Sequence, residues 1–494
     1  MERSFKKEVT TLRLGDGDMF HGEGILGVTK ALLQSGVSYV GGYQGAPISH
    51  LMDVLSDAKP LLDELGIHFE VCANEASAAA MLAASVNYPI RGAVTWKSVV
   101  GTNVASDGLS NLASAGVKGG AVIVVGEDYG EGSSIIQERT HAFAMKSTMC
   151  LLDPRPELPM MTRMVEEAFK LSEASNMPSV LELRIRACHV YGHFDAKDNV
   201  NPLYSRNNKI PAAEFDFSRV CLPPATYTQE KHKIEHRLPA AIKYIADNNL
   251  NERFDGDVPE IGIIVQGGIY NTLMRGLRQF GLADSYGKSR ISTLVMNVTY
   301  PMVPDEIADF CVSKDAVLVV EEGQPEFIEQ AINAILRKKD VNAKIIGKDV
   351  FPMAGEYTSE VMLKGLYGFL SKYAPAGLNV KTVLAEIDQL FSDRDGAREI
   401  LGDGLPLRTP SFCTGCPERP IFSALKILEK ELGPAHISAD IGCHTFAALP
   451  PFNVGNTVMG YGLGLASSAG LAPSFHKRVI SIMGDGGFWH NGMS

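Results

Sequence analysis

The stretch Ala121-Val122-Ile123-Val124-Val125 is a continuous apolar run with the length of a buried β-strand. Similar runs recur between Thr11 and Arg186, and segments with helical spacing of apolar residues separate them. The other runs are Val37–Val40, Ile67–Val71, Ala93–Trp96 and Val180–Ile185, and the helical segments lie near Glu23–Gln34, Ile48–Leu55, Glu75–Ser85 and Met161–Glu173. This βα repeat predicts an α/β fold with a parallel sheet covered on both faces.

The alternation of strand-like and helix-like segments predicts where the first unit ends and a second begins. Residues 1–200 carry the first repeat, and residues 201–257 gather charge, Asn and Pro, which is typical of a linker. Residues 258–390 resume the repeat as a smaller α/β domain. Its strand-like runs are Ile261–Val265, Ser292–Met296 and Ala316–Val320, the last followed by Glu321-Glu322, and its clearest helical pattern is Tyr270–Phe280.

A third unit follows a second connection. Residues 391–410 are rich in Asp, Gly and Arg, and we interpret them as a linker. Residues 411–494 begin another α/β domain, which we expect to be incomplete at its C-terminus. The fold class predicted for the whole chain is therefore multi-domain α/β.

Composition narrows the class of protein. The 494 residues carry a formal net charge of −11 without a Lys/Arg cluster, so a nucleic-acid partner is not expected. The first residues lack an apolar signal core, and no apolar stretch has the length of a membrane span, which favours a cytoplasmic protein away from membranes. Five isolated cysteines, Cys72, Cys150, Cys188, Cys221 and Cys311, are expected to be small buried side chains rather than disulfide partners.

The apolar run Val479–Met483 leads into Gly484-Asp485-Gly486. Asp485 offers a hard oxygen ligand to a cation, and the glycines allow phosphate oxygens to approach the backbone. Gly-Asp-Gly is also common in ordinary turns, so the motif alone does not decide between a turn and a metal-diphosphate site.

Three further patterns leave alternatives open. Cys413, Cys416 and Cys443 suit a zinc site, a redox pair or an iron–sulfur cluster, and each kind of metal site needs a fourth ligand. Glu75 either complements a helix dipole or is a desolvated carboxylate that hydrogen-bonds a cofactor ring. The small residues of Met459–Gly470 permit close approach of a ligand or of another helix.

Taken together, the motifs resemble those of the thiamine-diphosphate-dependent 2-oxoacid:ferredoxin oxidoreductases, most closely the indolepyruvate branch and its alpha subunit. The resemblance covers essentially the whole chain, in order and spacing. The matching stretches are Tyr43–Pro47, Asn74-Glu75, Asn103–Asp107, Gly116–Gly120, Cys413–Pro417, Asp440–Cys443 and Gly484–Gly486.

The resemblance assigns a part to each domain and motif. Residues 1–200 would be a pyrimidine-binding domain, in which Glu75 hydrogen-bonds the aminopyrimidine and shifts its tautomer. Residues 411–494 would bind the diphosphate through Mg²⁺, with Asp485 as a ligand. The cofactor-binding glycines would be Gly442, Gly462, Gly484 and Gly486.

The remaining assignments concern substrate and electrons. Arg139 would bind the substrate carboxylate, because a guanidinium suits that task. Cys413, Cys416 and Cys443 would be three ligands of a [4Fe-4S] cluster. The implied reaction is oxidative decarboxylation of a 2-oxoacid, an aryl one such as indolepyruvate by first expectation, with coenzyme A accepting the acyl group and ferredoxin or a similar acceptor taking the electrons.

The sequence departs from the family pattern in two places. The family's Tyr-Pro-Gly-Thr-Pro stands here as Tyr43-Gln44-Gly45-Ala46-Pro47, which removes a hydroxyl near the substrate. A further metal-ligating Asn and a fourth cluster cysteine are expected from a missing C-terminal portion or a partner subunit, in a homo-oligomer or hetero-oligomer. Competing hypotheses are a non-oxidative decarboxylase or carboligase, a non-catalytic subunit, and a zinc-stapled scaffold.

Overall fold

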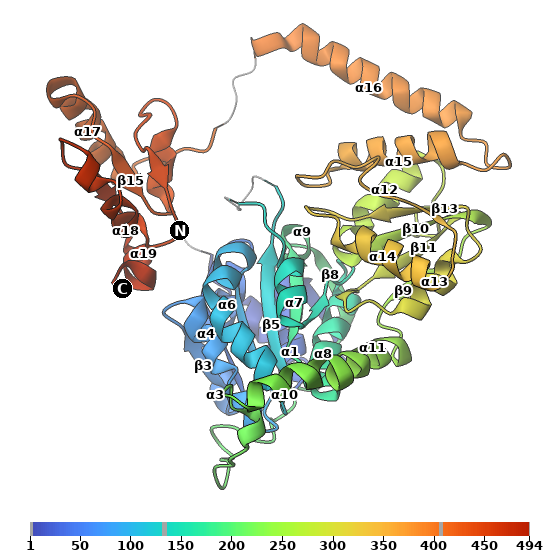
Figure 1. Cartoon of the computed structure of the whole chain (residues 1–494), viewed down its shortest axis with the longest axis horizontal. Helices are drawn as coiled ribbons and strands as arrows, with labels where there is room; N and C mark the ends of the chain where they lie inside the picture. Colours follow the sequence, from blue (N-terminus) through green and yellow to red (C-terminus); the bar gives the residue numbers. More distant parts are fainter. Residues whose placement is uncertain (1–2, 131–135, 405–408, 494) are drawn as a thin grey trace. The chain divides into compact units, whose positions relative to one another are not determined.

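A computed structural model describes residues 3–130, 136–404 and 409–493 of the chain. Two compact units divide it, Met1–Leu390 and Phe391–Ser494 (Figure 1). Within the described residues, the first unit holds sheets of seven, five and two strands, and the second holds a sheet of three strands. The multi-domain α/β class predicted from the sequence is confirmed. The predicted boundaries at residues 1 and 494 and part of the predicted linker 391–410 lie outside the described residues.

The seven-stranded sheet is the frame of the first unit. Its order is β12-β6-β7-β5-β4-β2-β3, and all strands except the edge strand β12 run parallel. The strands are β2 (Tyr39–Gly42), β3 (His68–Val71), β4 (Gly92–Lys97), β5 (Ala121–Glu127), β6 (Cys150–Leu152), β7 (Ser179–Arg184) and β12 (Val298–Tyr300). The apolar run that begins at Ala121 therefore forms the middle strand of the sheet.

Alternation along β5 explains why that run is apolar throughout. Val122 and Val124 enter one hydrophobic core with α1 (Gly24–Gln34) and α8 (Leu158–Ser175). Ala121, Ile123 and Val125 enter another core with α4 (Glu75–Met81) and α6 (Ser98–Ala115). Successive side chains of a strand point to opposite faces, so helices on both faces require both sets to be apolar.

Several elements of the first unit differ from the predicted ones. The helix expected over Glu75–Ser85 is broken into α4 and α5 (Ala84–Asn87). Strands β1 (Met19–Glu23) and β8 (Tyr191–Asp195) form an antiparallel pair that the pattern did not indicate. Each of them is short, and the two are stabilised by pairing with each other and by Phe20 and Phe194, which pack into the main hydrophobic core.

The segment 201–257, which the sequence predicts to be a linker, contains several regular elements. It contains α10 (Ala225–His232), α11 (Leu238–Asp247) and β9 (Glu252–Phe254), and α11 packs against α8. Ala241 and Ile245 of α11 are buried, and Leu238, Ile242 and Tyr244 pack against the same core. β9 pairs with β11 as an edge strand of the next sheet.

The five-stranded sheet has the order β14-β13-β10-β11-β9. Its other strands are β10 (Val258–Gln266), β11 (Ile291–Met296), β13 (Ala316–Val320) and β14 (Lys344–Ile346), which run parallel to one another. The remaining helices of this unit are α2 (Ser49–Asp57), α3 (Lys59–Glu64), α7 (Thr140–Ser147), α9 (Ile185–Cys188), α12 (Tyr270–Gln279), α13 (Pro304–Cys311), α14 (Phe327–Lys338) and α15 (Ser359–Tyr373).

Asn297 connects the two large sheets. It is the single residue between β11 and β12, so the chain passes from one sheet directly to the edge of the other. Its side-chain amide donates to the Leu250 carbonyl at 3.0 Å, and its Oδ1 accepts from the Arg155 amide at 2.9 Å. Asn297 is fully buried, and these bonds satisfy its polar atoms.

The second connection is also largely helical. α16 (Lys381–Leu401) runs through residue 391, whereas the sequence analysis interpreted 391–410 as a linker. Ile387 is the only α16 residue classed as buried among those described, so no apolar stripe distinguishes this helix from a polar connection.

The second unit is a small parallel α/β layer. β15 (Ile437–Ala439) lies between β16 (Thr457–Val458) and β17 (Ile480–Ile482). The helices are α17 (Glu418–Leu432), α18 (Gly464–Ala469) and the short α19 (Asp485–Gly487). Its core is the buried set Phe412, Phe422, Ile437, Ala447 and Val454.

No helix among the described residues is long and apolar enough to cross a bilayer. Of the isolated cysteines, Cys72, Cys150, Cys188 and Cys311 are buried as expected. Cys221 is exposed, which contradicts the expectation for that residue.

Candidate cofactor-binding site

Glu75 is the first residue of α4, at the carboxyl end of β3. The side chain of Asn74 caps this helix by accepting a hydrogen bond from the Ser77 amide at 2.9 Å. Only 3% of Glu75 is exposed, although a carboxylate in the first turn of a helix is usually solvated. The helix-dipole interpretation explains the position of Glu75 but not its burial.

Gly101 on α6 makes room for this burial. A Cβ at Gly101 would lie 2.4 Å from Trp96 Cδ1 and 2.8 Å from Glu75 Cγ. Trp96 is fully buried, and its Nε1 donates to Thr102 at 3.1 Å. Glu75 therefore lies against an indole and a glycine, which shield its carboxylate from water, as the cofactor-binding interpretation requires. No pattern in the sequence indicated that Gly101 and Glu75 are in contact.

Lys97 lies beside the loop Tyr43–Pro47. Its Nζ donates to the Ala46 carbonyl at 2.7 Å, and a Cβ at Gly45 would lie 2.7 Å from Lys97 Cβ. Burial lowers the pKa of Lys97 to about 8, although the negative charge of Asp128 acts to raise it. Lys97 was not among the predicted site residues. The one feature that could have indicated it is its position at the carboxyl end of a predicted strand.

Arg139 is buried rather than open to solvent. Its Nη1 donates to Glu321 Oε1 at 2.6 Å and also to the Pro325 carbonyl. The pKa of Arg139 is raised because Tyr129 and Glu321 outweigh the lowering effect of burial. Nε and Nη2 are buried without a hydrogen-bond partner. The guanidinium thus keeps unused donors while one nitrogen is committed to Glu321.

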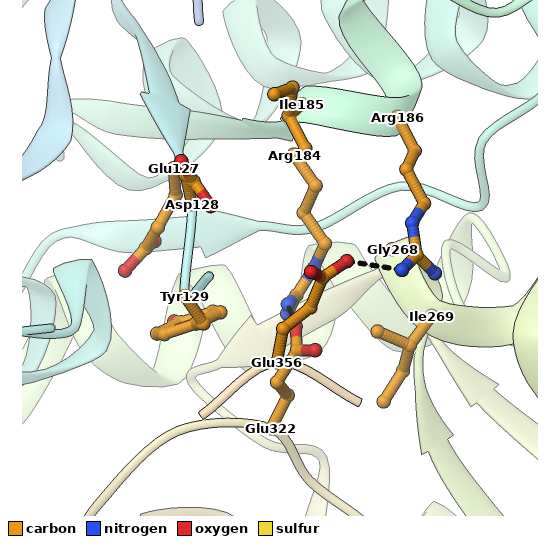
Figure 2. A pocket seen from close by; sticks show the side chains of 10 residues that line it. All are labelled: Glu127, Asp128, Tyr129, Arg184, Ile185, Arg186, Gly268, Ile269, Glu322 and Glu356. Atoms are coloured by element: carbon orange, nitrogen blue, oxygen red, sulfur yellow. Dashed lines mark hydrogen bonds and ion pairs between the residues drawn. The ribbon is translucent and has the colours of Figure 1, made fainter. Parts of the chain in front are cut away.

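A second buried ion pair lies next to the first. Arg184, at the end of β7, donates from Nη2 to Asp153 at 2.9 Å and from Nη1 to Glu322. Its guanidinium carbon lies 5.2 Å from the centre of the Tyr129 ring. Arg184, Tyr129 and Glu322 line a small cavity, together with Arg186, which pairs with Glu356 (Figure 2). The sequence did not indicate which of these charged residues pair with one another.

Glu127 and Glu182 add a buried acidic pair to this region. Glu127 Oε1 accepts from the Thr140 amide at 3.0 Å at the start of α7. Burial raises the pKa of Glu182 well above its ordinary value, and the charges of Glu127 and Asp153 raise it further. The neutral form of Glu182 is therefore favoured.

Asp440 organises the loops of the second unit. It is fully buried, its Oδ2 accepts from the Gly462 amide at 2.9 Å, and its Oδ1 accepts from the Gly484 amide at 3.2 Å. His444 Nε2 lies 2.8 Å from Oδ1. Burial alone would lower the pKa of His444, but its bonds to Asp440 raise it. Asp440 belongs to the motif Asp440–Cys443, but the sequence did not indicate this role for it.

The glycines of this unit are fixed by close contacts. Gly462 has a φ of +79°, and a Cβ there would lie 2.4 Å from the Gly487 carbonyl. A Cβ at Gly486 would meet the Tyr461 hydroxyl at 2.2 Å, and one at Gly442 would meet the His444 ring at 2.6 Å. Asp485 itself is exposed at the start of α19. The structure thus presents an accessible carboxylate on a backbone cradle that admits only glycine.

The cysteines lie at the edge of the same unit. The Cys416 amide donates to the Cys413 carbonyl at 3.2 Å, which forms the turn between them, and Cys443 begins a short 3₁₀ helix. The pKa of Cys443 is raised by burial and then by the charges of Glu418, Cys413 and Cys416. Cys413 and Cys443 are exposed. These three thiols are therefore near enough to interact electrostatically and open to a ligand.

Comparisons with known proteins show what the chain is similar to. Residues 440–494 match the model of the thiamine pyrophosphate enzyme C-terminal TPP-binding domain. Indolepyruvate oxidoreductase subunit IorA of Methanothermobacter marburgensis is 27% identical over 98% of this chain and 73% of its own length. The subunit of that name from Thermococcus kodakarensis is 26% identical over 94% of this chain and 70% of its own length.

The chain is therefore similar over nearly its whole length to subunits of indolepyruvate oxidoreductase, and its residues 440–494 match a thiamine-diphosphate-binding domain. Among solved structures, 2-oxoglutarate:ferredoxin oxidoreductase from Magnetococcus marinus aligns with a TM-score of 0.54 at 14% identity. That alignment covers 71% of this chain and 65% of the other and supports the fold. The resemblance to these oxidoreductases and the fold class expected from the sequence are confirmed.

Replacing Asp440 with Ala is expected to destabilise the second unit of this oxidoreductase. The change leaves His444 without its buried partner and frees two loop amides, so the free energy of unfolding should fall by about 3–5 kcal/mol. Equilibrium denaturation of the full chain measures this. The matched control is Asp485→Asn at the exposed site, which should change stability by less than about 0.5 kcal/mol. Equal effects of the two substitutions would contradict the role given to Asp440.

His141 provides a prediction about pH. Burial, with Arg139, lowers the pKa of His141 to about 3, and its ring stacks on Phe327 with centroids 5.5 Å apart. The unfolded chain binds the proton at an ordinary pKa near 6.5, so acid favours unfolding. The stability due to neutral His141 is present above about pH 6.5 and is lost as the pH falls toward 3.

Between pH 7 and pH 5 this loss should amount to about 2 kcal/mol in the wild type. His141→Gln should remove that part of the pH dependence, and His193→Gln at an exposed position should preserve it. Denaturation midpoints at several pH values measure the effect. The same pH dependence in wild type and His141→Gln would contradict the prediction.

Proposed function

We propose that this chain is the thiamine-diphosphate-binding catalytic subunit of a complex that oxidatively decarboxylates an aryl 2-oxoacid, such as indolepyruvate, to an acyl-CoA. Oxidation of a 2-oxoacid is the activity common to the family. The observation that carries the proposal is the burial of Glu75 at the carboxyl edge of a parallel sheet, where α/β folds bind their ligands. The aryl preference rests on the name of the relatives.

Glu75 would hold the aminopyrimidine ring of the cofactor. A carboxylate buried against Trp96 and Gly101 has few solvent partners to exchange for a ring nitrogen, so its hydrogen bond to the cofactor should be strong. In that position Glu75 exchanges a proton with the ring. The bound cofactor supplies the electron sink that lets carbon dioxide leave a 2-oxoacid.

Asp485 would ligate Mg²⁺ at the diphosphate. An exposed carboxylate in the turn after β17 suits a hard cation. Gly442, Gly462, Gly484 and Gly486 would bind phosphate oxygens through their backbone, which carries no side chain at these positions. Asp440 would then be a positioning residue, because it holds the amides of Gly462 and Gly484 without being exposed itself.

Arg139 would bind the substrate carboxylate through the edge of its guanidinium that Glu321 does not use. Nε and Nη2 remain without a hydrogen-bond partner, which is the pair of donors that a bidentate contact needs. Lys97, with its lowered pKa, is a second cation beside the loop that carries Ala46.

Cys413, Cys416 and Cys443 would hold three corners of a [4Fe-4S] cluster that passes electrons to ferredoxin or a similar acceptor, with a further ligand from elsewhere in the complex. Within the described chain, these sulfurs do not meet the 4.8 Å spacing expected of ligands to a single ion. A cluster holds its cysteines farther apart than a single ion does, so a cluster fits them better than zinc. A partner subunit would complete the enzyme in a hetero-oligomer.

Glu75→Gln in the complete complex is expected to lower turnover by about 10²-fold or more, because the amide cannot exchange the proton. Cofactor binding, measured by calorimetry, should persist, since the amide keeps the shape of the side chain. The matched control is Glu70→Gln, because Glu70 is an exposed residue of β3, the strand that precedes Glu75. Unchanged turnover in Glu75→Gln would favour a non-catalytic subunit.

Replacing Cys413, Cys416 or Cys443 with serine is expected to reduce the iron and sulfide content of the anaerobically purified complex. The same substitutions should abolish reduction of the electron acceptor. Cys221→Ser, at an exposed isolated cysteine, should leave both unchanged. Fully active cluster-free enzyme would instead favour a non-oxidative decarboxylase, and zinc in place of iron would favour a scaffold.

A further inference from the structure

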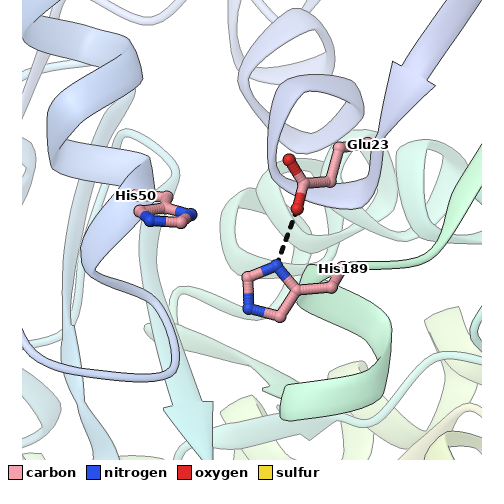
Figure 3. A group of neighbouring side chains, drawn as sticks. All are labelled: Glu23, His50 and His189. Atoms are coloured by element: carbon pink, nitrogen blue, oxygen red, sulfur yellow. Dashed lines mark hydrogen bonds and ion pairs between the residues drawn. The ribbon is translucent and has the colours of Figure 1, made fainter. Parts of the chain in front are cut away.

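Glu23, His50 and His189 bring three potential metal ligands together outside the site described above. One ligand atom from each residue lies within 4.8 Å of the other two, and this is the one such group of His, Cys, Asp and Glu found in the described part of the chain. Figure 3 shows the side chains converging from three segments. Glu23 ends β1, His50 lies in the first turn of α2, and His189 follows α9.

Hydrogen bonding within the group leaves one buried nitrogen without a partner. His189 Nδ1 lies 2.6 Å from Glu23 Oε1, and this contact accounts for one oxygen of the carboxylate. The other oxygen, Oε2, is buried and is held only by an ion pair with Arg3. His50 Nδ1 is buried and has no hydrogen-bond partner, which is unfavourable, and a cation bound by His50 and Glu23 would satisfy it.

Charge and exposure also suit a cation. Glu23 is only 8% exposed, so its negative charge acts through a weakly screening environment. The side chain of His189 is 44% exposed, which provides an entry path from solvent. Arg3 is the competing cation, because its Nη1 lies 2.8 Å from Glu23 Oε2. Its side chain is 44% exposed and can move into solvent when a metal binds.

We propose that Glu23, His50 and His189 form a binding site for a divalent transition-metal ion of the zinc class. Two imidazoles and one carboxylate suit Zn²⁺, whereas Mg²⁺ and Ca²⁺ prefer oxygen ligands alone. Three protein ligands leave a fourth position for water. The ion would join the starts of α1 and α2 to the end of α9 and would fix His50, which follows the Tyr43–Pro47 loop after Ile48 and Ser49.

Cobalt(II) titration of the full chain, read by visible absorption, tests the proposal. Imidazole and carboxylate ligation should give a d–d spectrum without a thiolate charge-transfer band, which separates this site from the exposed cysteines. Zn²⁺ should displace the cobalt and raise the melting temperature. His50→Gln should weaken binding by more than about tenfold, since even the loss of an outer partner costs about 10–100-fold.

Variants with opposite expected effects complete the test. Arg3→Gln should tighten cobalt binding because it removes the competing cation. Glu23→Gln repeats the ligand deletion with a different side chain, should His50→Gln fail to fold. His21→Gln is the matched control, because His21 and His193 form a neighbouring histidine pair across β1 and β8 with ring centres 5.6 Å apart. Unchanged cobalt affinity in His50→Gln and Glu23→Gln, or loss of binding in His21→Gln, would overturn the proposal.

Discussion

Two neighbouring glutamates after β13 accept buried guanidinium groups from the part of the first unit that holds the seven-stranded sheet. Glu321 pairs with Arg139, which precedes α7, Glu322 pairs with Arg184 at the end of β7, and these four side chains are at most 6% exposed. A buried charge without its partner would cost about 3–5 kcal/mol. The carboxyl end of β13 is therefore held against the carboxyl end of β7 and the start of α7.

This constraint explains the character of the candidate site. Parallel sheets gather ligands at their carboxyl ends, and here two such edges meet over a layer of charges that are mostly paired. Arg139 is held by Glu321 yet retains unused donors, and Glu127 holds the start of the helix that follows Arg139. In the second unit Asp440 has a similar effect, because one buried carboxylate fixes two loops and His444.

The sequence predicted elements well where both faces are buried. β5 and α8 lie where the apolar patterns predicted a strand and a helix. The pattern did not indicate β1 and β8, which pair with each other, or the helix α16. Those segments carry few buried apolar residues, so their local pattern resembles that of a linker. The apolar residues of α11 were not recognised because the segment around them is rich in charge, Asn and Pro. Cys221 was expected to be buried because isolated cysteines usually are, but it is exposed. The spacing of cysteines along the chain contains no information on their exposure.

The sequence by itself determined the α/β class, the family resemblance and the chemical groups of the candidate site, because apolar periodicity and motif order are local properties of the chain. Glu75, Asp485 and the three cysteines were recognisable in this way, and their roles are proposals that the comparisons leave untested. Only the tertiary structure placed Gly101 against Glu75, paired Arg139 with Glu321, gave Asp440 its position and assembled Glu23 with His50 and His189. Each of these contacts joins residues distant in the chain, and burial then decides which charges are paired and which polar atoms remain available.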